Sequence, residues 1–261
     1  MDRAQVLSTL FVADETPNLP RLGGMARADG VVIASERFWA FARRDGTVHE
    51  GDMPSPPRAI RRVPLLRGLV RLGLALAPLF GGTGVARARE RVLLVAALLA
   101  PPSLVFLPQS FGMPVGIATA VVLLAWLLRG RTLFLHGAEH RAIAAAESGS
   151  LIDTWLGAAR PSRFSPRCGT NFAALVIPVS VGADRIWPLA TAVYTPFAVT
   201  LVSLALTMEL WQFVQASRSP LARVCLLPGL ALQRLTTREP SDEETQIALA
   251  GVASVLRREL A

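Results

Sequence analysis

The 261-residue sequence has no lysine and only two cysteines, one tyrosine and three histidines. Cys168 and Cys225 are too few for a disulfide-stabilised scaffold, and they lack the paired spacing of a zinc ribbon. The sequence predicts no signal peptide at its start, because Asp2, Asp14 and Glu15 interrupt the first apolar stretch. These absences exclude a small disulfide-rich protein and a zinc ribbon as fold classes.

Apolar residues, by contrast, are abundant and occur in blocks. They make up 52% of the chain, with a mean hydropathy of +0.43. Soluble proteins have roughly 45–50% even with glycine counted. Apolar blocks of this kind are typical of membrane segments. The formal net charge is +8, and all 27 basic residues are arginines that cluster at the ends of the apolar blocks. This placement favours anchoring to anionic lipid headgroups over binding to nucleic acid.

The sequence predicts a mainly α fold: a multi-pass membrane helical bundle with a small N-terminal β-hairpin region and a cytoplasmic C-terminal helix. We expect a cytoplasmic segment with the hairpin, a basic amphipathic helix at the membrane interface, the bundle, and a cytoplasmic C-terminal segment. Their bounds are 1–57, 58–91, 92–214 and 215–261. The hairpin is predicted because apolar runs flank the turn dipeptide Asp45-Gly46. The last helix is predicted because residues 241–244 form a capping box.

Four apolar blocks are candidates for the membrane spans: Val92–Leu107, Met113–Leu128, Phe172–Ala183 and Ile186–Phe213. A spanning helix needs roughly 17–25 residues, so the first two blocks are marginal and the third is short. The positive-inside rule places the arginine-rich loop 129–171 and both termini in the cytoplasm. The sequence therefore predicts a protein of the bacterial inner membrane with about four spans and both termini in the cytoplasm.

The motif His136-Gly-Ala-Glu139-His140 is the sharpest chemical signal in the sequence. Residues four apart on a helix project from one face, so both imidazoles can reach one metal ion. Glu139 beside them can bind the metal or polarise a bound water, and the string matches the H-x-x-E-H pattern of inverted zinc proteases. The alternative is a pair of interfacial histidines that hydrogen-bond to headgroups or to backbone. The sequence alone leaves both interpretations open.

Three further residues are candidates for the same site. The predicted topology brings two of them, Cys168 and Glu209, to the membrane depth of His136, and the third, Arg238, lies in a polar string that could close over the site. Cys168, as a thiolate, would be a third metal ligand or a nucleophile activated by a histidine; otherwise it is a buried apolar residue. Glu209 is an acid inside the fourth block, where a charge is expensive unless it is paired, functional or able to snorkel to water. Arg238 would bind an anionic group, or lie in a turn before the last helix.

Three strings in this order resemble the YqhQ-like family of bacterial membrane proteins, domain of unknown function 1385. They are HGAEH (136–140), PRCGT (166–170) and PGLALQRLTTREP (228–240). The resemblance runs from about Gly23 to Leu256 and implies an uncharacterised multi-pass protein, of a kind sometimes labelled a metal-dependent enzyme. The sequence departs from the family pattern at four positions: Asp29 replaces another acid, Ser165 a histidine, Met208 a tyrosine and Gln246 an acid. Ser165 removes one potential ligand.

The sequence thus predicts an uncharacterised membrane protein that acts as a metal-dependent, hydrolase-like enzyme at the cytoplasmic membrane face. The predicted metal ligands are His136, His140, Glu209 and Cys168, and the predicted catalytic residues are Glu139, as general base, and Arg238. The expected cofactor is a divalent metal, zinc before others, and the expected partners are membrane lipids and no nucleic acid. The alternative is a non-enzymatic membrane scaffold or assembly factor, whose polar motifs join helices by hydrogen bonds.

Overall fold

The computed structural model describes residues 2–81, 85–103, 106–107, 109–127, 130–187, 194–217 and 219–261. The chain forms two compact units. Unit 1 comprises Met1–Ser55, Leu128–Cys168 and Leu230–Ala261, and unit 2 comprises Pro56–Leu127 and Gly169–Gly229. Both ends of the chain therefore belong to unit 1.

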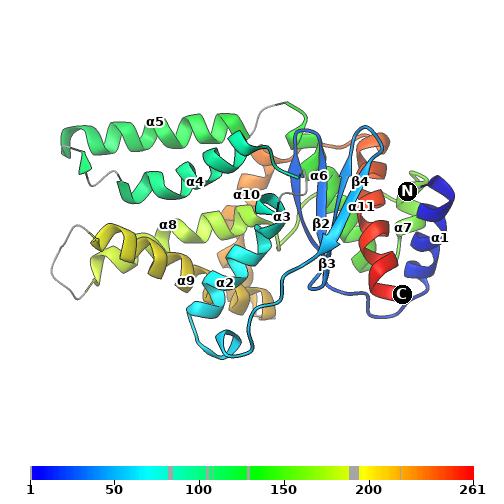
Figure 1. Ribbon diagram of the computed structural model, residues 1–261, viewed down its shortest axis with the longest axis horizontal. Coiled ribbons are helices and arrows are strands. Elements are labelled where there is room, and N and C mark those ends of the chain that lie inside the picture. Colours follow the sequence, from blue (N-terminus) through cyan, green and yellow to red (C-terminus); the bar gives the residue numbers. More distant parts are fainter. Residues whose placement is uncertain are drawn as a thin grey trace. The chain divides into compact units, whose positions relative to one another are not determined.

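Unit 1 is built on a four-stranded antiparallel sheet with the strands in chain order (Figure 1). The strands are β1 (Gly23–Arg27), β2 (Gly30–Ala34), β3 (Phe38–Arg43) and β4 (Val48–Asp52). The helices of the unit are α1 (Arg3–Asp14), α6 (Thr132–Ser148), α7 (Leu151–Trp155) and α11 (Asp242–Leu260). Helices α6 and α11 pack against the sheet, and α1 and α7 pack against α11.

The hairpin predicted around Asp45-Gly46 is confirmed, since β3 and β4 pair with Phe41 opposite His49. Gly46 has a φ of +84°, a left-handed conformation that a glycine adopts without a steric penalty. The backbone N–H of Thr47 donates to Asp45 Oδ1 at 2.9 Å, an interaction typical of aspartate in turns. Local turn chemistry therefore explains why this element could be predicted.

Helix α11 lies at the centre of unit 1 rather than in a peripheral tail. Most of its apolar face is buried: Leu249, Val252, Ala253 and Leu256 are fully buried, whereas Leu260 at its end is 38% exposed. The predicted capping box is also present, because Ser241 and Glu244 each accept a hydrogen bond from the other's backbone N–H. The same core contains buried residues of β2, β3 and α6: Val31, Ile33, Ala40, Leu135, Ala138 and Ala142.

Unit 2 is helical, and α9 (Thr195–Ala216) is its central element, contacted by α2, α4 and α8. The other elements are η1 (Ile60–Arg62), α2 (Leu66–Ala75), α3 (Ala77–Phe80), α4 (Ala88–Ser103), α5 (Gln109–Leu127) and α8 (Gly169–Arg185). Helix α10 (Pro220–Thr236) begins in unit 2 and ends in unit 1. The basic amphipathic helix predicted for residues 58–91 is divided in the structure into η1, α2, α3 and the start of α4.

The prediction of a multi-pass membrane bundle is wrong. Among the residues that the structure describes, α9 is the one helix long and apolar enough to cross a membrane. The first predicted span overlaps α4 and the third lies within α8; these helices have 16 and 17 residues, at or below the lower limit of the roughly 17–25 residues of a spanning helix. Many apolar residues are instead buried inside unit 1, where they form the core between the sheet and its helices. Residues 104–105, 128 and 188–193 of the predicted spans, and residue 129 of the predicted loop, lie outside the described residues.

Candidate metal centre

His136, His140 and Cys168 form a compact cluster in unit 1. The two histidines lie one turn apart on α6, with ring centroids separated by 4.5 Å. His136 Nε2 is 3.2 Å from Cys168 Sγ. One ligand atom from each of the three residues lies within 4.8 Å of the other two. The structure therefore brings together three of the four predicted metal ligands.

Backbone carbonyls determine which nitrogen of each imidazole can bind a metal. His136 Nδ1 is 2.8 Å from the carbonyl oxygen of Thr236, and His140 Nδ1 is 2.6 Å from that of Arg163. A carbonyl oxygen only accepts hydrogen bonds, so Nδ1 of each ring carries the proton and Nε2 keeps its lone pair. His140 Nε2 is buried and has no hydrogen-bond partner among the described residues. This is the arrangement that orients histidine ligands in metal sites.

Burial keeps both imidazoles neutral. It lowers the pKa of His136, although the hydrogen bond to the Thr236 carbonyl acts in the opposite direction. Burial, helped by the charge of His136, lowers the pKa of His140 to about 4, and the Arg163 carbonyl opposes this shift. At neutral pH both rings are thus in the form that coordinates a metal.

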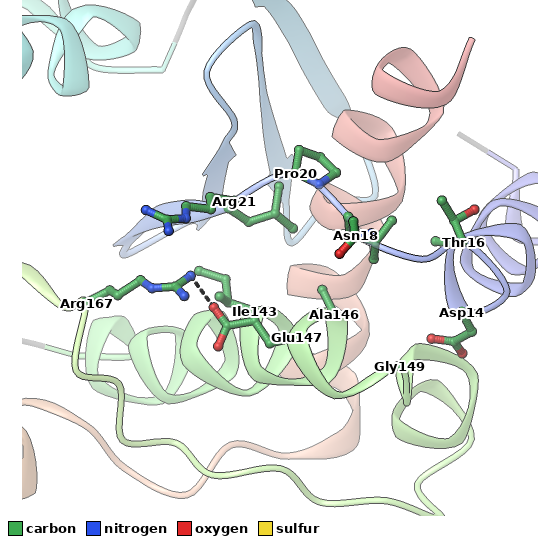
Figure 2. Close-up of a pocket in the computed structure, with 13 residues that line it drawn as sticks. Asp14, Thr16, Asn18, Pro20, Arg21, Ile143, Ala146, Glu147, Gly149 and Arg167 are labelled. Atoms are coloured by element: carbon green, nitrogen blue, oxygen red, sulfur yellow. Dashed lines mark hydrogen bonds and ion pairs between the residues drawn. The ribbon is translucent and has the colours of Figure 1, made fainter. Parts of the chain in front are cut away.

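Cys168 is positioned by the segment of residues 160–168, here called the strap, which runs along α6. Near one end, Arg167 forms an ion pair with Glu147 at the end of α6 (Figure 2). Nearer the other end, Arg141 of α6 donates to the carbonyl of Pro161 at 3.2 Å. These contacts hold the strap against the helix that carries both histidines.

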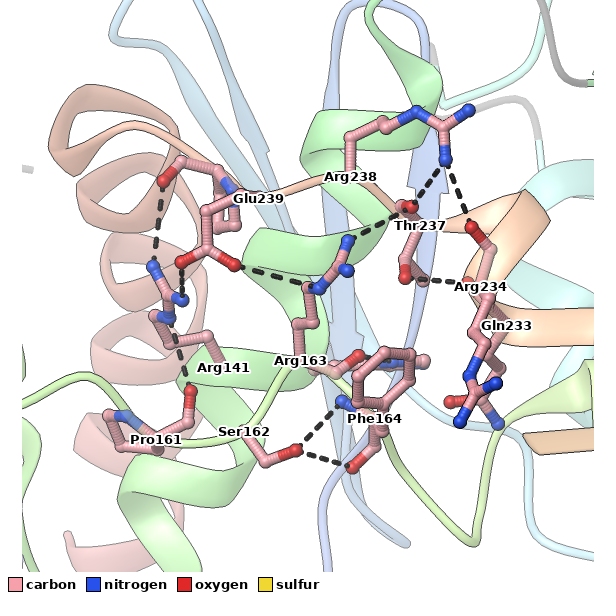
Figure 3. Close-up of polar contacts among 12 residues, drawn as sticks. Arg141, Pro161, Ser162, Arg163, Phe164, Gln233, Arg234, Thr237, Arg238 and Glu239 are labelled. Carbon is pink, nitrogen blue, oxygen red and sulfur yellow. Dashed lines mark hydrogen bonds and ion pairs between the residues drawn. The ribbon is translucent and has the colours of Figure 1, made fainter. Parts of the chain in front are cut away.

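The last turn of α10 and the residues after it hold the strap from another side (Figure 3). Gln233, which is fully buried, accepts from Ser165 N at 2.8 Å and donates to Ser165 O at 2.7 Å. Arg163 donates to the carbonyl of Thr237 at 3.1 Å. Glu239 forms ion pairs with both Arg163 and the buried Arg141. Sequence reasoning missed Gln233, Arg163 and the Thr236 carbonyl, although two of the three lie in the family string 228–240.

Gly137 lets the residues after α10 approach α6 closely. A Cβ at this position would lie 2.2 Å from the carbonyl oxygen of Arg238. The backbone N–H of Arg238 donates to Leu133 O at 2.9 Å, which fixes the same approach. The exposed Arg238 guanidinium donates to the carbonyls of Arg234 and Thr237, so it is not directed into the cluster.

Glu139 directly precedes His140 in sequence, but its side chain lies against the sheet. A Cβ placed on Gly24 of β1 would be 2.8 Å from Glu139 Cγ. Burial raises the pKa of Glu139 to about 8. No hydrogen bond to this carboxyl occurs among the described residues, and it is outside the three-residue cluster. Its role as general base stays a prediction.

Glu209 lies in α9 of unit 2, where its carboxylate is bonded to the guanidinium of Arg67 in α2. It also accepts from the backbone N–H of Leu65 at 3.3 Å. Glu209 is thus an acid in an apolar helix that has an ion-pair partner in a neighbouring helix. The cluster of possible metal ligands found among the described residues does not include Glu209. The sequence could not exclude Glu209 because its partner lies 142 residues away.

The donor set fits a zinc ion. Bonds of roughly 2.0–2.3 Å to nitrogen and sulfur in a tetrahedral site separate ligand atoms by about 3.3–3.6 Å. Three atoms within 4.8 Å of one another are near enough to bind one ion once the side chains move inward. Two imidazoles and a thiolate leave a fourth position open, a pattern that occurs in catalytic zinc sites.

Comparison with known sequences places this site in a family. The family described as "Protein of unknown function (DUF1385)" matches residues 120–258, which is more than half of the chain. The chain belongs to the DUF1385 family. The "Uncharacterized protein YqhQ" of Bacillus subtilis (strain 168) is 33% identical over 136 residues, which cover 49% of this chain and 42% of that relative. No solved structure matches the chain. The DUF1385 match contains α6 and the strap, and therefore the whole cluster, together with all of α11 except its last two residues.

Proposed function

We propose that the chain binds zinc through His136 Nε2, His140 Nε2 and Cys168 Sγ, and that this centre serves a hydrolase. The supporting observation is that both Nδ1 atoms donate to backbone carbonyls, which leaves both Nε2 atoms available to a metal. A buried Nε2 without a partner is unfavourable, and coordination would satisfy it.

Each part of the surroundings has a role in this proposal. Zinc, when bound, lowers the pKa of a coordinated water to about 7 and so supplies hydroxide at neutral pH. The Thr236 and Arg163 carbonyls orient the imidazoles, and the strap holds the thiol beside them. Glu139 and Arg238 are not part of the proposal, because one packs against β1 and the other bonds to carbonyls of its own segment.

The test is the zinc content of the purified full chain, measured by inductively coupled plasma mass spectrometry after dialysis. We expect about one zinc per chain in the wild type, in line with a single three-ligand site. The double variant His136→Ala/His140→Ala and the variant Cys168→Ser should lose it. Cys225→Ser is the matched control, since this second free cysteine is in unit 2, and it should retain the metal. Equal zinc in the wild type and the double variant would overturn the proposal.

The dense hydrogen bonding of the strap supports a second candidate function, a non-enzymatic scaffold in which these polar motifs only hold the fold together. The two candidates differ in their response to a chelator. A metal centre predicts that EDTA lowers the melting temperature of the wild type and not that of the double variant. A scaffold predicts that the double variant melts earlier, while EDTA changes neither protein.

We also propose that the chain acts at the anionic surface of a bacterial cell membrane. Helix α9 supports this, as do the exposed Val63, Leu65 and Leu66, which follow the exposed Arg61 and Arg62. Apolar side chains beside arginines are suited to the boundary between headgroups and acyl chains. Flotation with phosphatidylglycerol and phosphatidylcholine vesicles tests it: we expect stronger binding to the former, reduced by Arg61→Gln/Arg62→Gln. Equal recovery with both vesicles would refute it.

A further inference from the structure

Unit 1 contains a pocket that involves none of the three cluster residues. Its volume is about 420 Å³, and it is lined by residues between Ala13 and Leu22, by the last turns of α6 and by Arg167 (Figure 2). Small-molecule sites have volumes of roughly 300–1,000 Å³, so the pocket can hold a compact metabolite. We call it the α6 pocket.

The α6 pocket is lined by two acids and two arginines, and among these four the exposed Arg21 is the one without a hydrogen bond or ion pair in the described part of the chain. Asp14 already accepts hydrogen bonds from the backbone N–H groups of Leu151 and Ile152, at 2.9 Å each. Glu147 is paired with Arg167. In Figure 2, Arg21 lies at the same end of the pocket as Arg167. At this end of the pocket one guanidinium therefore has no partner, and the other is paired with Glu147.

The pair of Glu147 and Arg167 can exchange partners readily. The side chains are 48% and 39% exposed, and water competes strongly with ion pairs of this exposure. A guanidinium presents paired N–H donors that match the oxygens of a carboxylate or a phosphate. An anion in the pocket can therefore bind Arg167 in place of Glu147, with Arg21 completing its coordination.

The α6 pocket also has a defined relation to the candidate metal centre. His136, His140, Ile143 and Glu147 succeed one another at steps of three or four residues, so they share one side of α6. Arg167 directly precedes Cys168 in the strap. The pocket and the cluster are thus built on the same helix face and the same strap.

We propose that the α6 pocket binds a small molecule that carries a carboxylate or phosphate group, held by Arg21 and Arg167. The experiment is isothermal titration calorimetry of the full chain with inorganic phosphate and, separately, with succinate. Metal is first removed with EDTA and the chain is then transferred to EDTA-free buffer, because EDTA itself carries carboxylates. With no metal for either probe to bind, the result is independent of the zinc proposal. We expect saturable binding of at least one probe, weakened at least tenfold by Arg21→Gln and by Arg167→Gln.

Arg44→Gln is the control, because it removes the same charge from an exposed position of unit 1 outside the pocket. Binding should be unchanged in this variant. Arg21→Gln removes no hydrogen bond or ion pair among the described residues, so the variant is expected to fold, which its melting temperature checks. Binding of phosphate alone or of succinate alone identifies the anionic group of the ligand. The absence of saturable binding with both probes, or binding that neither pocket variant weakens, would overturn the proposal.

Discussion

At the scale of single residues, Gly24 shows how a carboxylic acid is accommodated between α6 and the sheet. A side chain at this position would place Cβ 2.8 Å from both Glu139 Cγ and the carbonyl oxygen of Val32. A Cβ added to the neighbouring Gly23 would have no other atom within 4 Å. The two glycines of one strand therefore differ sharply in their surroundings, which the sequence cannot distinguish.

Gly24→Ala should destabilise unit 1 by about 1–3 kcal/mol, because overpacking forces neighbouring groups to shift. Gly23→Ala introduces the same methyl group into the same strand and should change the free energy of unfolding by less than about 0.5 kcal/mol. Urea denaturation of the three proteins measures both effects. Similar midpoints for the two variants would show that β1 does not press against Glu139.

At the scale of elements, the candidate site depends on the strap and on the end of α10. The i, i+4 spacing of His136 and His140 was enough to predict two imidazoles on one helix face, and the structure confirms that arrangement. The Nδ1 acceptors could not be predicted, because they are backbone carbonyls of Thr236 and Arg163, which any residue type would supply. Gln233 is a buried polar residue within an apolar helix, and its spacing to Ser165 carries no local signal.

Gln233→Ala should lower zinc affinity without removing a ligand, because both hydrogen bonds that hold Ser165, three residues before Cys168, are lost. Outer-shell changes typically weaken metal binding by about 10–100-fold. A competition titration with a chromophoric chelator measures the Kd. Gln246→Ala is the matched control, since Gln246 is bonded to the carbonyl of Trp155, in a part of unit 1 that contains no strap residue. An unchanged Kd in Gln233→Ala would show that the strap does not position the thiol.

The sheet was predicted only in part, because its strands differ in the strength of their local sequence signals. The β3–β4 hairpin has an Asp-Gly turn, so its signal is local. Strand β1 begins with two glycines, which have low strand propensity, and β2 is buried along nearly its whole length, so it lacks the alternation of a half-exposed strand. Helix α1 is only weakly amphipathic, and Val6, Leu10 and Ala13 are buried through tertiary contacts.

For the whole molecule, the high apolar content led to the wrong prediction of a membrane bundle, since among the described residues one helix is long and apolar enough to cross a membrane. Hydropathy records how much apolar surface must be covered, but it does not specify whether lipid or protein covers it. In unit 1 the cover is a sheet packed against α6 and α11. In unit 2, Arg67 and Arg71 of α2 donate to Glu209 and Gln212 of α9.

The division of unit 1 into three stretches of chain has a topological consequence. Residues 56–127 and 169–229 each leave this folded body and return to it. Because each of these stretches begins and ends in unit 1, any stretch that enters a bilayer must return to the side on which unit 1 lies. A tag at the first residue and a tag at the last should therefore always be accessible from the same side, and each excursion can traverse lipid only an even number of times, zero included.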